Sequence, residues 1–162
     1  SIGNYFSTML DQSMSWKDAE KLCSQWGGHF ALKGIMSVED AKRAVDIGCS
    51  GIMVSNHGGR QLDGSRSPFD QLTEIVDAVG DKIDVICEGG IQRGTHILKA
   101  LSIGAKACSG GRLYLYALSG AGQAGVEKAL GQYCAELERG MKLMGCKKIS
   151  DLSRNNLRFR RK

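Results

Sequence analysis

One stretch of the chain combines an imidazole, two glycines and a guanidinium directly after a short apolar run. The run 51–54 has the length and β-branched content of a buried strand, and Ser-Asn-His-Gly-Gly-Arg-Gln-Leu-Asp follows it at 55–63. An imidazole accepts protons near neutral pH, and a guanidinium holds a carboxylate. The glycines let the backbone turn and approach a ligand closely. His57 and Arg60 are therefore candidates for taking a proton from an acid substrate and for binding its carboxylate, although an isolated motif of this kind also suits a plain polar loop.

A second pattern, at 88–95 and 110–112, is typical of an anion site. Glu-Gly-Gly-Ile-Gln-Arg-Gly-Thr places three glycines between an expected strand and an expected helix, and Gly-Gly-Arg follows the next strand. Backbone N–H groups, a helix N-terminus and a guanidinium together favour phosphate. Tight turns without any ligand are the alternative reading of the same glycines.

The elements that must position these residues alternate along the chain. We expect strands at 29–34, 51–54, 83–87 and 105–109, and helices at 15–26, 37–47, 68–79, 95–103 and 126–144, with a short helix at 149–152. Strands that alternate with helices at this spacing predict a parallel sheet with crossover helices, whose ligands sit at the carboxyl ends of the strands. Those ends carry Lys33, Ser55 to Arg60, Glu88 to Gly90, and Gly111-Arg112.

Composition sets the broad class. The 162 residues are 42% hydrophobic and 24% charged, which is ordinary for a globular domain, and no run of eighteen apolar residues predicts a membrane span. Six cysteines without regular spacing are read as free core thiols, not as disulfides or metal ligands. The net charge of +5 owes much to the C-terminal residues, and we interpret these as a solvated tail, not as a nucleic-acid site.

The motifs at 32–34, 54–63, 89–95 and 111–112 resemble the FMN-dependent α-hydroxy-acid dehydrogenase/oxidase family, which includes L-lactate dehydrogenases and glycolate oxidases. The likeness covers residues 30–150 in order and spacing, and it extends to the branch that acts on a peptide precursor of mycofactocin. It implies an α/β fold, the carboxyl-terminal half of a (β/α)8 TIM barrel with four βα units and parallel strands. It also implies FMN as cofactor and oxidation of an L-2-hydroxy acid, such as lactate, to a 2-oxo acid.

The resemblance assigns a role to each matching residue. His57 becomes the catalytic proton acceptor and Arg60 the substrate carboxylate clamp. The cofactor-binding set is Lys33 beside the flavin, Ser55, and Glu88, Gly89, Gly90, Gln92, Gly111 and Arg112 along the ribityl and phosphate side. Two positions depart from the family pattern, because Glu88 replaces an aspartate and Gln92 replaces an arginine. Arg93 is a candidate to replace the missing cation.

Family members are much longer and form a complete barrel, so the resemblance also divides the chain. Residues 1–28 would hold an N-terminal segment and a helix of the preceding barrel unit, 29–150 the four βα units with the FMN and substrate edge, and 151–162 a basic tail. The expected partners are a small 2-hydroxy acid and either a second copy or the missing half-barrel, without nucleic acid. The expected location is the cytoplasm or the periphery of the inner membrane.

Two other readings remain open. A half-barrel could bind FMN or another phosphorylated ligand and catalyse nothing, and an inosine-monophosphate dehydrogenase type of barrel shares a similar glycine-rich edge. The pairing of His57 with Arg60 argues against the second reading, because that class has no use for a carboxylate clamp there. His29 and His96 are interpreted as structural.

Overall fold

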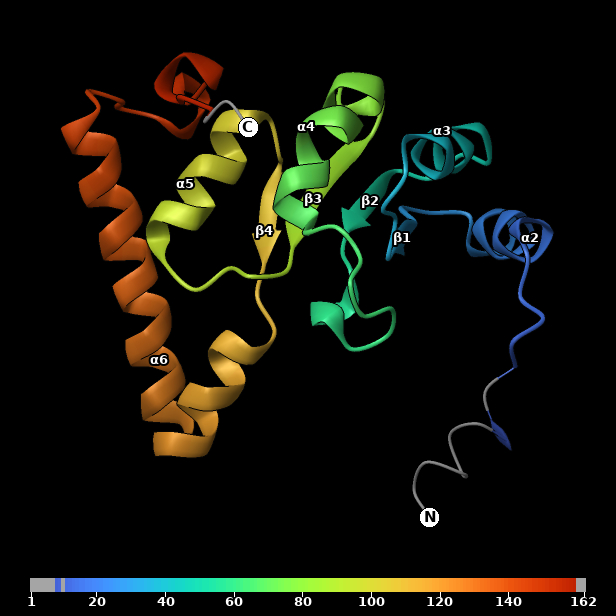
Figure 1. Ribbon diagram of the computed structural model, residues 1–162, viewed down its shortest axis with the longest axis horizontal. Helices are drawn as coiled ribbons and strands as arrows, with labels where there is room; N and C mark the ends of the chain where they lie inside the picture. The colour runs from blue at the N-terminus through green and yellow to red at the C-terminus, as the bar shows by residue number, and fades with distance from the viewer. Residues whose placement is uncertain (1–7, 10, 160–162) are drawn as a thin grey trace.

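Four parallel strands alternate with helices along the chain (Figure 1). The computed structural model describes residues 8–9 and 11–159. The basic residues 160–162 of the predicted tail, and residues 1–7 and 10 of the predicted N-terminal segment, lie outside these ranges. The elements are α2 (Trp16–Trp26), β1 (Ala31–Lys33), α3 (Val38–Asp46), β2 (Gly51–Val54), η1 (His57–Gly59), α4 (Pro68–Val79), β3 (Asp84–Glu88), α5 (Gly94–Ile103), β4 (Ala107–Ser109), α6 (Arg112–Leu143), η2 (Ile149–Asp151) and η3 (Arg154–Asn156).

The strands form one sheet in the order β1-β2-β3-β4, and every neighbouring pair is parallel. The register places Lys33, Met53, Ile86 and Ala107 side by side across the sheet. All four strands therefore end at one edge, as parallel pairing with crossover helices requires. The predicted α/β class with four βα units is confirmed.

Local capping explains where three of the helices begin. Ser37 and Ser67 each accept a hydrogen bond on the side-chain oxygen from the amide three residues later, at 3.0 and 3.1 Å. Pro68 then occupies the first turn of α4, where a missing N–H costs nothing. Before α2, the Ser15 amide donates to the Asp18 carboxylate at 2.8 Å. Such capping residues satisfy amide groups that have no partner in the first turn of a helix.

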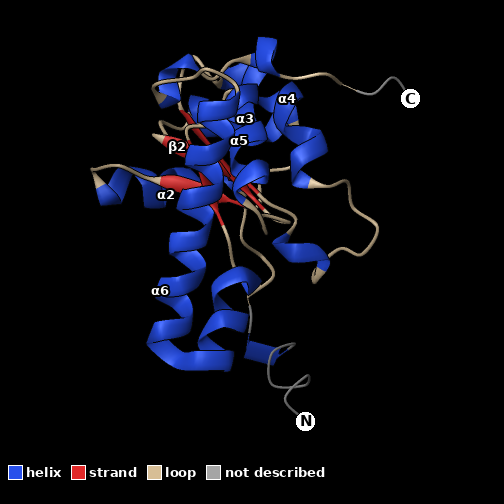
Figure 2. Ribbon diagram, turned by 90° about the vertical axis from the view of Figure 1, so that its left-hand side faces the viewer, coloured by secondary structure: helices blue, strands red, loops and turns tan. Residues whose placement is uncertain are grey.

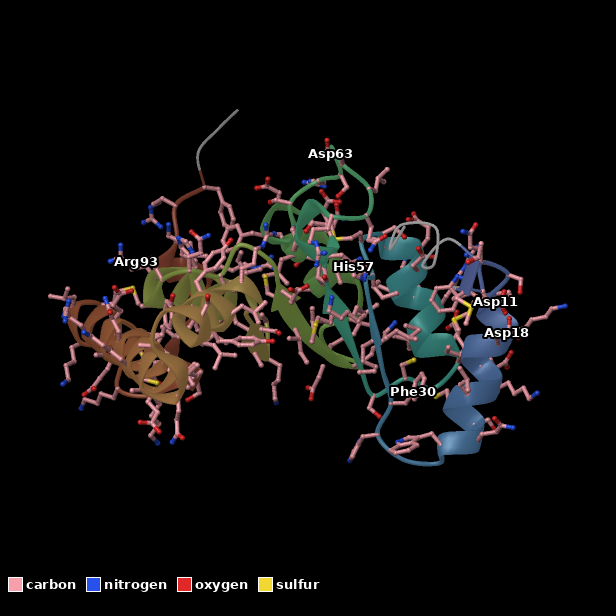
Figure 3. The ribbon with its side chains drawn as sticks, turned by 90° about the horizontal axis from the view of Figure 1, so that it is seen from below. Asp11, Asp18, Phe30, His57, Asp63 and Arg93 are labelled. Atoms are coloured by element: carbon pink, nitrogen blue, oxygen red, sulfur yellow. The ribbon has the colours of Figure 1, made fainter. Side chains whose placement is uncertain are left out.

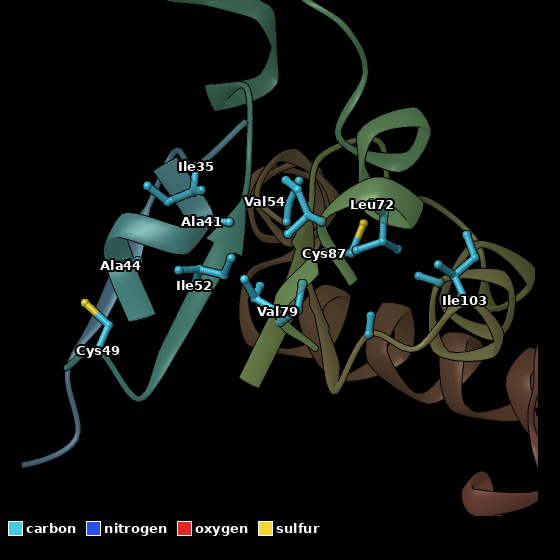
Figure 4. Close-up of a cluster of buried hydrophobic side chains, with 14 of the residues drawn as sticks. Ile35, Ala41, Ala44, Cys49, Ile52, Val54, Leu72, Val79, Cys87 and Ile103 are labelled. Atoms are coloured by element: carbon cyan, nitrogen blue, oxygen red, sulfur yellow. The ribbon is translucent and has the colours of Figure 1, made fainter. Parts of the chain in front are cut away.

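The hydrophobic core lies between the sheet and helices α3, α4 and α5 (Figure 4). Ile52 and Val54 of β2 are fully buried, and so are Leu72, Ile75 and Val79 of α4. Because side chains alternate along a strand, the residues between Ile52 and Val54 or beyond them point to the opposite face. The core therefore covers only one face of the sheet.

The opposite face is only partly covered, as the alternation makes visible. Met53 and Ile86 are half-buried, while Lys33 and Ala107, at the two outer strands, are exposed. β1 and β4 each pair on one side only, so each presents a free strand edge. The sheet thus has one covered face and one face that is more open, and Figure 2 shows the strands, in red, among the helices.

Helix α6 is the largest difference from the sequence-based expectation. We predicted its start near Val126, but α6 begins at Arg112, directly after β4. Ala121 and Gly122 have non-helical backbone angles, so α6 bends back on itself there, and its longer arm lies beside α5 (Figure 1). Although α6 is long, no helix in the described part of the chain has the apolar length needed to cross a membrane.

The periphery of the fold is looser than its centre. Cys23 is the one buried residue of α2, whereas the apolar side chains of Leu22 and Trp26 are exposed. Cys23, Cys49 and Cys87 are buried free thiols, but Cys134 is exposed, so the reading of the cysteines as core residues was wrong for it. Burial raises the pKa of the Cys87 thiol to about 11.

Part of the predicted basic tail packs onto the fold. Leu152 is buried, and the Arg154 side chain donates to the Ile103 carbonyl at 3.1 Å and pairs with Asp77 at 2.5 Å. The segment through η3 therefore anchors the C-terminal end of α5.

Candidate functional site

Three polar side chains from three strands meet at the carboxyl edge of the sheet. The Lys33 ammonium lies 3.2 Å from a Glu88 carboxylate oxygen and donates to the Ser55 hydroxyl at 3.1 Å. The Ser55 hydroxyl in turn donates to the same Glu88 oxygen and accepts the His57 amide at 3.1 Å. One donor and two acceptor positions of Ser55 are thus all used, which is what its 1% exposure requires.

This cluster places one cation at the rim, held from behind by a carboxylate. The Lys33 side chain is 47% exposed, whereas that of Glu88 is only 13% exposed. The ammonium therefore faces the open side of the sheet while its counter-ion is shielded. A ligand that gains negative charge next to Lys33 is favoured there.

The His57 loop is built by backbone turns that bring its side chains over the sheet edge. Asn56 accepts the Gly58 amide at 3.1 Å, and His57, Gly58 and Gly59 all have positive φ, at 56, 70 and 72°. The His57 ring lies against Gly34, where a Cβ would come within 2.8 Å of its Cε1 atom. Within the described residues, no group hydrogen-bonds the ring nitrogens or pairs with the Arg60 guanidinium, so both side chains are free to meet a ligand.

The glycine-rich segments after β3 and β4 flank this loop. Gly89 and Gly90 have positive φ, at 124 and 70°, and a Cβ at Gly90 would meet nothing within 4 Å. Arg112, at the start of α6, donates from Nη2 to the Gly58 carbonyl at 2.6 Å, which ties the β4 edge to the His57 loop. The N-terminus of α6, with Gly111 as its cap residue, opens onto the same space.

Arg93 does not supply the positive charge that is missing because residue 92 is a glutamine. Its guanidinium forms two hydrogen bonds with Glu136 of α6, from Nε, at 2.9 and 3.0 Å. The Glu136 carboxylate also accepts the first amide of α5, from Gly94, at 2.8 Å. The helix N-terminus that we expected to face a phosphate is therefore occupied by a side chain of the protein itself.

These residues surround a cleft of about 430 Å³. Nine of the ten predicted site residues line it, and the tenth, Ser55, is buried beneath it and bonds to Lys33 and Glu88. Figure 3 shows His57 and Asp63 on one loop, with Arg93 further along towards α5 and α6. The cleft also has lining residues that the sequence analysis did not select: Gly58, Gln61, Ile91, Gly110, Leu113, Leu115 and Tyr116.

The cleft is suited to an organic anion more than to a metal ion. Arg60, Lys33 and Arg112 supply positive charge to its lining, and five glycines supply backbone. Among the described residues, no three His, Cys, Asp or Glu side chains converge as a metal site would need.

We call the interaction of Glu136 with Arg93 and with the Gly94 amide the Glu136 clamp, and it predicts how stability depends on pH. Hydrogen bonds from Arg93, and next from the Gly94 amide, hold the pKa of the Glu136 carboxyl below its ordinary range. A glutamate carboxyl in the unfolded chain has a pKa of about 4.3. The clamp therefore stabilises the fold fully above that pH, and this stabilisation is lost as the pH falls through the lower pKa of Glu136 in the folded protein. We expect Glu136→Gln to lower the free energy of unfolding at pH 7 and to flatten its decline between pH 5 and 3 in urea titrations.

Glu127→Gln is the matched control, since Glu127 lies exposed on the same helix and forms no ion pair within the described residues. If the free energy of unfolding had the same pH dependence in both variants, the stabilising role of the clamp would be contradicted.

Comparison with known proteins identifies the family of the chain. The model of the family described as FMN-dependent dehydrogenase matches residues 1–159. The chain belongs to this family. An FMN-dependent alpha-hydroxy acid dehydrogenase of Penicillium citrinum is 41% identical over 154 residues, which are 95% of this chain and 38% of that protein. An L-lactate oxidase of Nostoc sp. is 47% identical over 91% of this chain and 40% of its own length.

Solved structures of family members show the same arrangement of elements. The (S)-mandelate dehydrogenase of Pseudomonas putida, a soluble mutant of a membrane-associated enzyme, superposes with a TM-score of 0.88 at 38% identity over 92% of this chain. A mandelate oxidase variant with a monooxide FMN adduct gives 0.83 at 43% identity over 87%. The chain spans only 42% and 45% of these two structures, so the four βα units are half of a family barrel.

Proposed function

We propose that this chain carries the FMN and substrate edge of an enzyme that oxidises an L-2-hydroxy acid of the lactate type to a 2-oxo acid. The observation that supports this most is the convergence of nine of the ten motif residues on one cleft, with His57 and Arg60 on a single loop. Relatives named L-lactate oxidase and L-lactate dehydrogenase, at 47% and 45% identity, support the lactate-like substrate class. The branch named pre-mycofactocin synthase is similar at 44% identity.

The cleft has the features that FMN requires. Its volume falls in the usual range for small-ligand sites, about 300–1,000 Å³, and its lining combines glycine backbone with the guanidinium groups of Arg60 and Arg112 and the ammonium group of Lys33. In this proposal Gly89, Gly90, Gly111 and Arg112 bind the phosphate and ribityl side, and the Lys33 ammonium stabilises the reduced ring. Bound FMN supplies the two-electron acceptor.

The protein groups then hold the substrate and move one proton. The Arg60 guanidinium binds the substrate carboxylate in a two-pronged pair, which fixes the hydroxyl-bearing carbon over the cofactor edge. His57 takes the proton of that hydroxyl as the substrate is oxidised. Ser55 and Glu88 position two of these groups. The Ser55 hydroxyl accepts the His57 amide, and the Glu88 carboxylate pairs with the Lys33 ammonium.

A half-barrel that binds FMN without catalysis is the second candidate, and one observation favours it. No described residue hydrogen-bonds the His57 ring, although a catalytic imidazole ordinarily needs a partner that fixes its tautomer. The residues that would supply such a partner belong to the other half of the barrel, whose strands would pair with the free edges of β1 and β4. Pairing with that half, and a cytoplasmic location, remain predictions from the sequence.

The experiment is an FMN titration followed by flavin fluorescence, and then anaerobic bleaching of the bound flavin with L-lactate. Arg112→Met should weaken FMN binding about 10- to 100-fold, because a charged hydrogen-bonding group is lost. Lys82→Met removes an exposed cation in the turn after α4 and should leave FMN affinity unchanged. Binding without bleaching would support the non-catalytic candidate, and no binding would refute both.

A further inference from the structure

His96, which the motif did not include, contacts the glycine-rich loop from behind. It is the third residue of α5, and its Nδ1 atom lies 3.0 Å from the Gly90 carbonyl oxygen and 3.2 Å from the Gln92 amide nitrogen. Gly90 and Gln92 both line the cleft, whereas His96 does not. The imidazole is therefore linked to the site through two backbone groups of the loop.

One nitrogen atom cannot serve both groups in the same protonation state. Without a proton, Nδ1 accepts the Gln92 N–H; with a proton, it donates to the Gly90 carbonyl. In the imidazolium both ring nitrogens carry protons, so only the second arrangement remains. Protonation of His96 therefore releases the Gln92 N–H from the ring and adds a positive charge behind the loop.

The surrounding charges leave the ring without an ion pair in the described part of the chain. Arg93 and Glu136, the nearest charged pair on the loop and on α6, are bound to each other. The other titratable or charged groups on α5 and the elements packed against it are Lys99 on α5 itself; Arg112, Tyr114, Tyr116, Glu127, Lys128, Tyr133, Cys134, Glu138, Arg139 and Lys142 on α6; Asp70, Glu74 and Asp77 on α4; Arg154 on η3; and Cys108 on β4. Of these, Asp77 and Arg154 pair with each other.

We propose that His96 is a positioning residue of the phosphate loop, and that an anion bound at this loop takes up a proton on His96. The proposal rests on the anion site of the proposed function. The imidazolium behind the loop adds a positive charge that stabilises an anion bound on the cleft side of the loop, so the binding of the anion and of the proton favour each other. Unperturbed imidazoles change charge between pH 5 and 8, which is the range that the test covers.

Sulfate tests this coupling, because it binds where phosphate does and does not itself titrate in this range. Sodium sulfate is titrated into ¹⁵N-labelled protein at pH 5.5 and 8.0 and constant ionic strength, in a His57→Asn background that removes the imidazole lining the cleft. The chemical shifts of the loop amides and of the two remaining histidine rings, His29 and His96, are followed by NMR. We expect sulfate to bind about fivefold or more tightly at pH 5.5, with His96 Nδ1 protonated in the complex.

His96→Asn is the decisive variant, since its amide keeps a polar atom near the position of Nδ1 and does not titrate. It should reduce the pH effect on sulfate affinity to less than about twofold. The shift of the Gln92 amide in protein that keeps His96 should follow the titration of the His96 ring without any ligand, so the test stands even if His96→Asn fails to fold. Sulfate binding that is equal at both pH values, or a Gln92 amide that ignores His96, would overturn the inference alone. Absence of sulfate binding at both pH values would overturn the proposed function with it.

Discussion

His57→Asn is expected to lower the rate of substrate-dependent flavin reduction by about 10²- to 10⁴-fold, the range that a positioned acid or base contributes. Asparagine is the right replacement because His57 has φ of 56°, a left-handed conformation that asparagine tolerates better than most residues. The loop should therefore keep its shape while the proton acceptor is lost. Anaerobic stopped-flow measurement of flavin bleaching by L-lactate gives the rate directly.

Two further measurements make the result specific. FMN affinity should stay within about twofold of the unsubstituted protein, because His57 is not among the groups assigned to the phosphate or ribityl chain. His29→Asn, which changes an exposed histidine near the start of β1, should leave the bleaching rate unaltered. An undiminished rate in His57→Asn would show that another group accepts the proton.

Gly94→Ala is expected to lower the free energy of unfolding by about 3 kcal/mol, at the upper end of the overpacking range. A Cβ at Gly94 would lie 2.6 Å from the Leu137 amide nitrogen and 2.8 Å from the Tyr133 carbonyl oxygen. Backbone atoms cannot rotate out of the way as side-chain atoms can, so α5 and α6 would have to separate. Separation would also stretch the bond from the Gly94 amide to Glu136.

The same substitution at Gly131 is a matched control on α6. A Cβ there would meet nothing within 4 Å, and alanine gains about 1 kcal/mol over glycine inside a helix. Urea unfolding should therefore show the two Gly→Ala changes moving stability in opposite directions. If both substitutions changed the free energy of unfolding in the same direction, the contact between α5 and α6 would accommodate an added methyl group without loss of stability.

The strands and helices α2, α3, α4 and α5 could be predicted because their signals are local. Ser37 and Pro68 mark helix starts by capping and first-turn chemistry, and the mainly apolar runs at 51–54 and 83–87 are short and contain β-branched residues. The start of α6 could not be predicted, because residues 112–125 carry three glycines, each costing about 1 kcal/mol in an isolated helix. Its break at Ala121 and Gly122 depends on how the two arms pack, which no local pattern records.

Part of the candidate site could also be predicted from the sequence, and part of it could not. The motif residues converge because they follow strands that end at one edge, which parallel topology dictates. Glu136 was missed because it meets Arg93 from 43 residues away, and the pairing removes the cation that the local sequence offered for phosphate. Leu115 and Tyr116 were missed because they reach the cleft only through the unexpected first arm of α6.

The left-handed backbone at His57 bears on how this chain can evolve. A non-glycine residue in that region costs on the order of 1–3 kcal/mol, which asparagine or glycine would largely recover. Selection for thermal stability alone would therefore favour replacement of His57. Under the proposed function, selection for catalytic turnover would retain it. A natural variant that has drifted to glycine at this position is expected to tolerate more heat and to have given up chemistry.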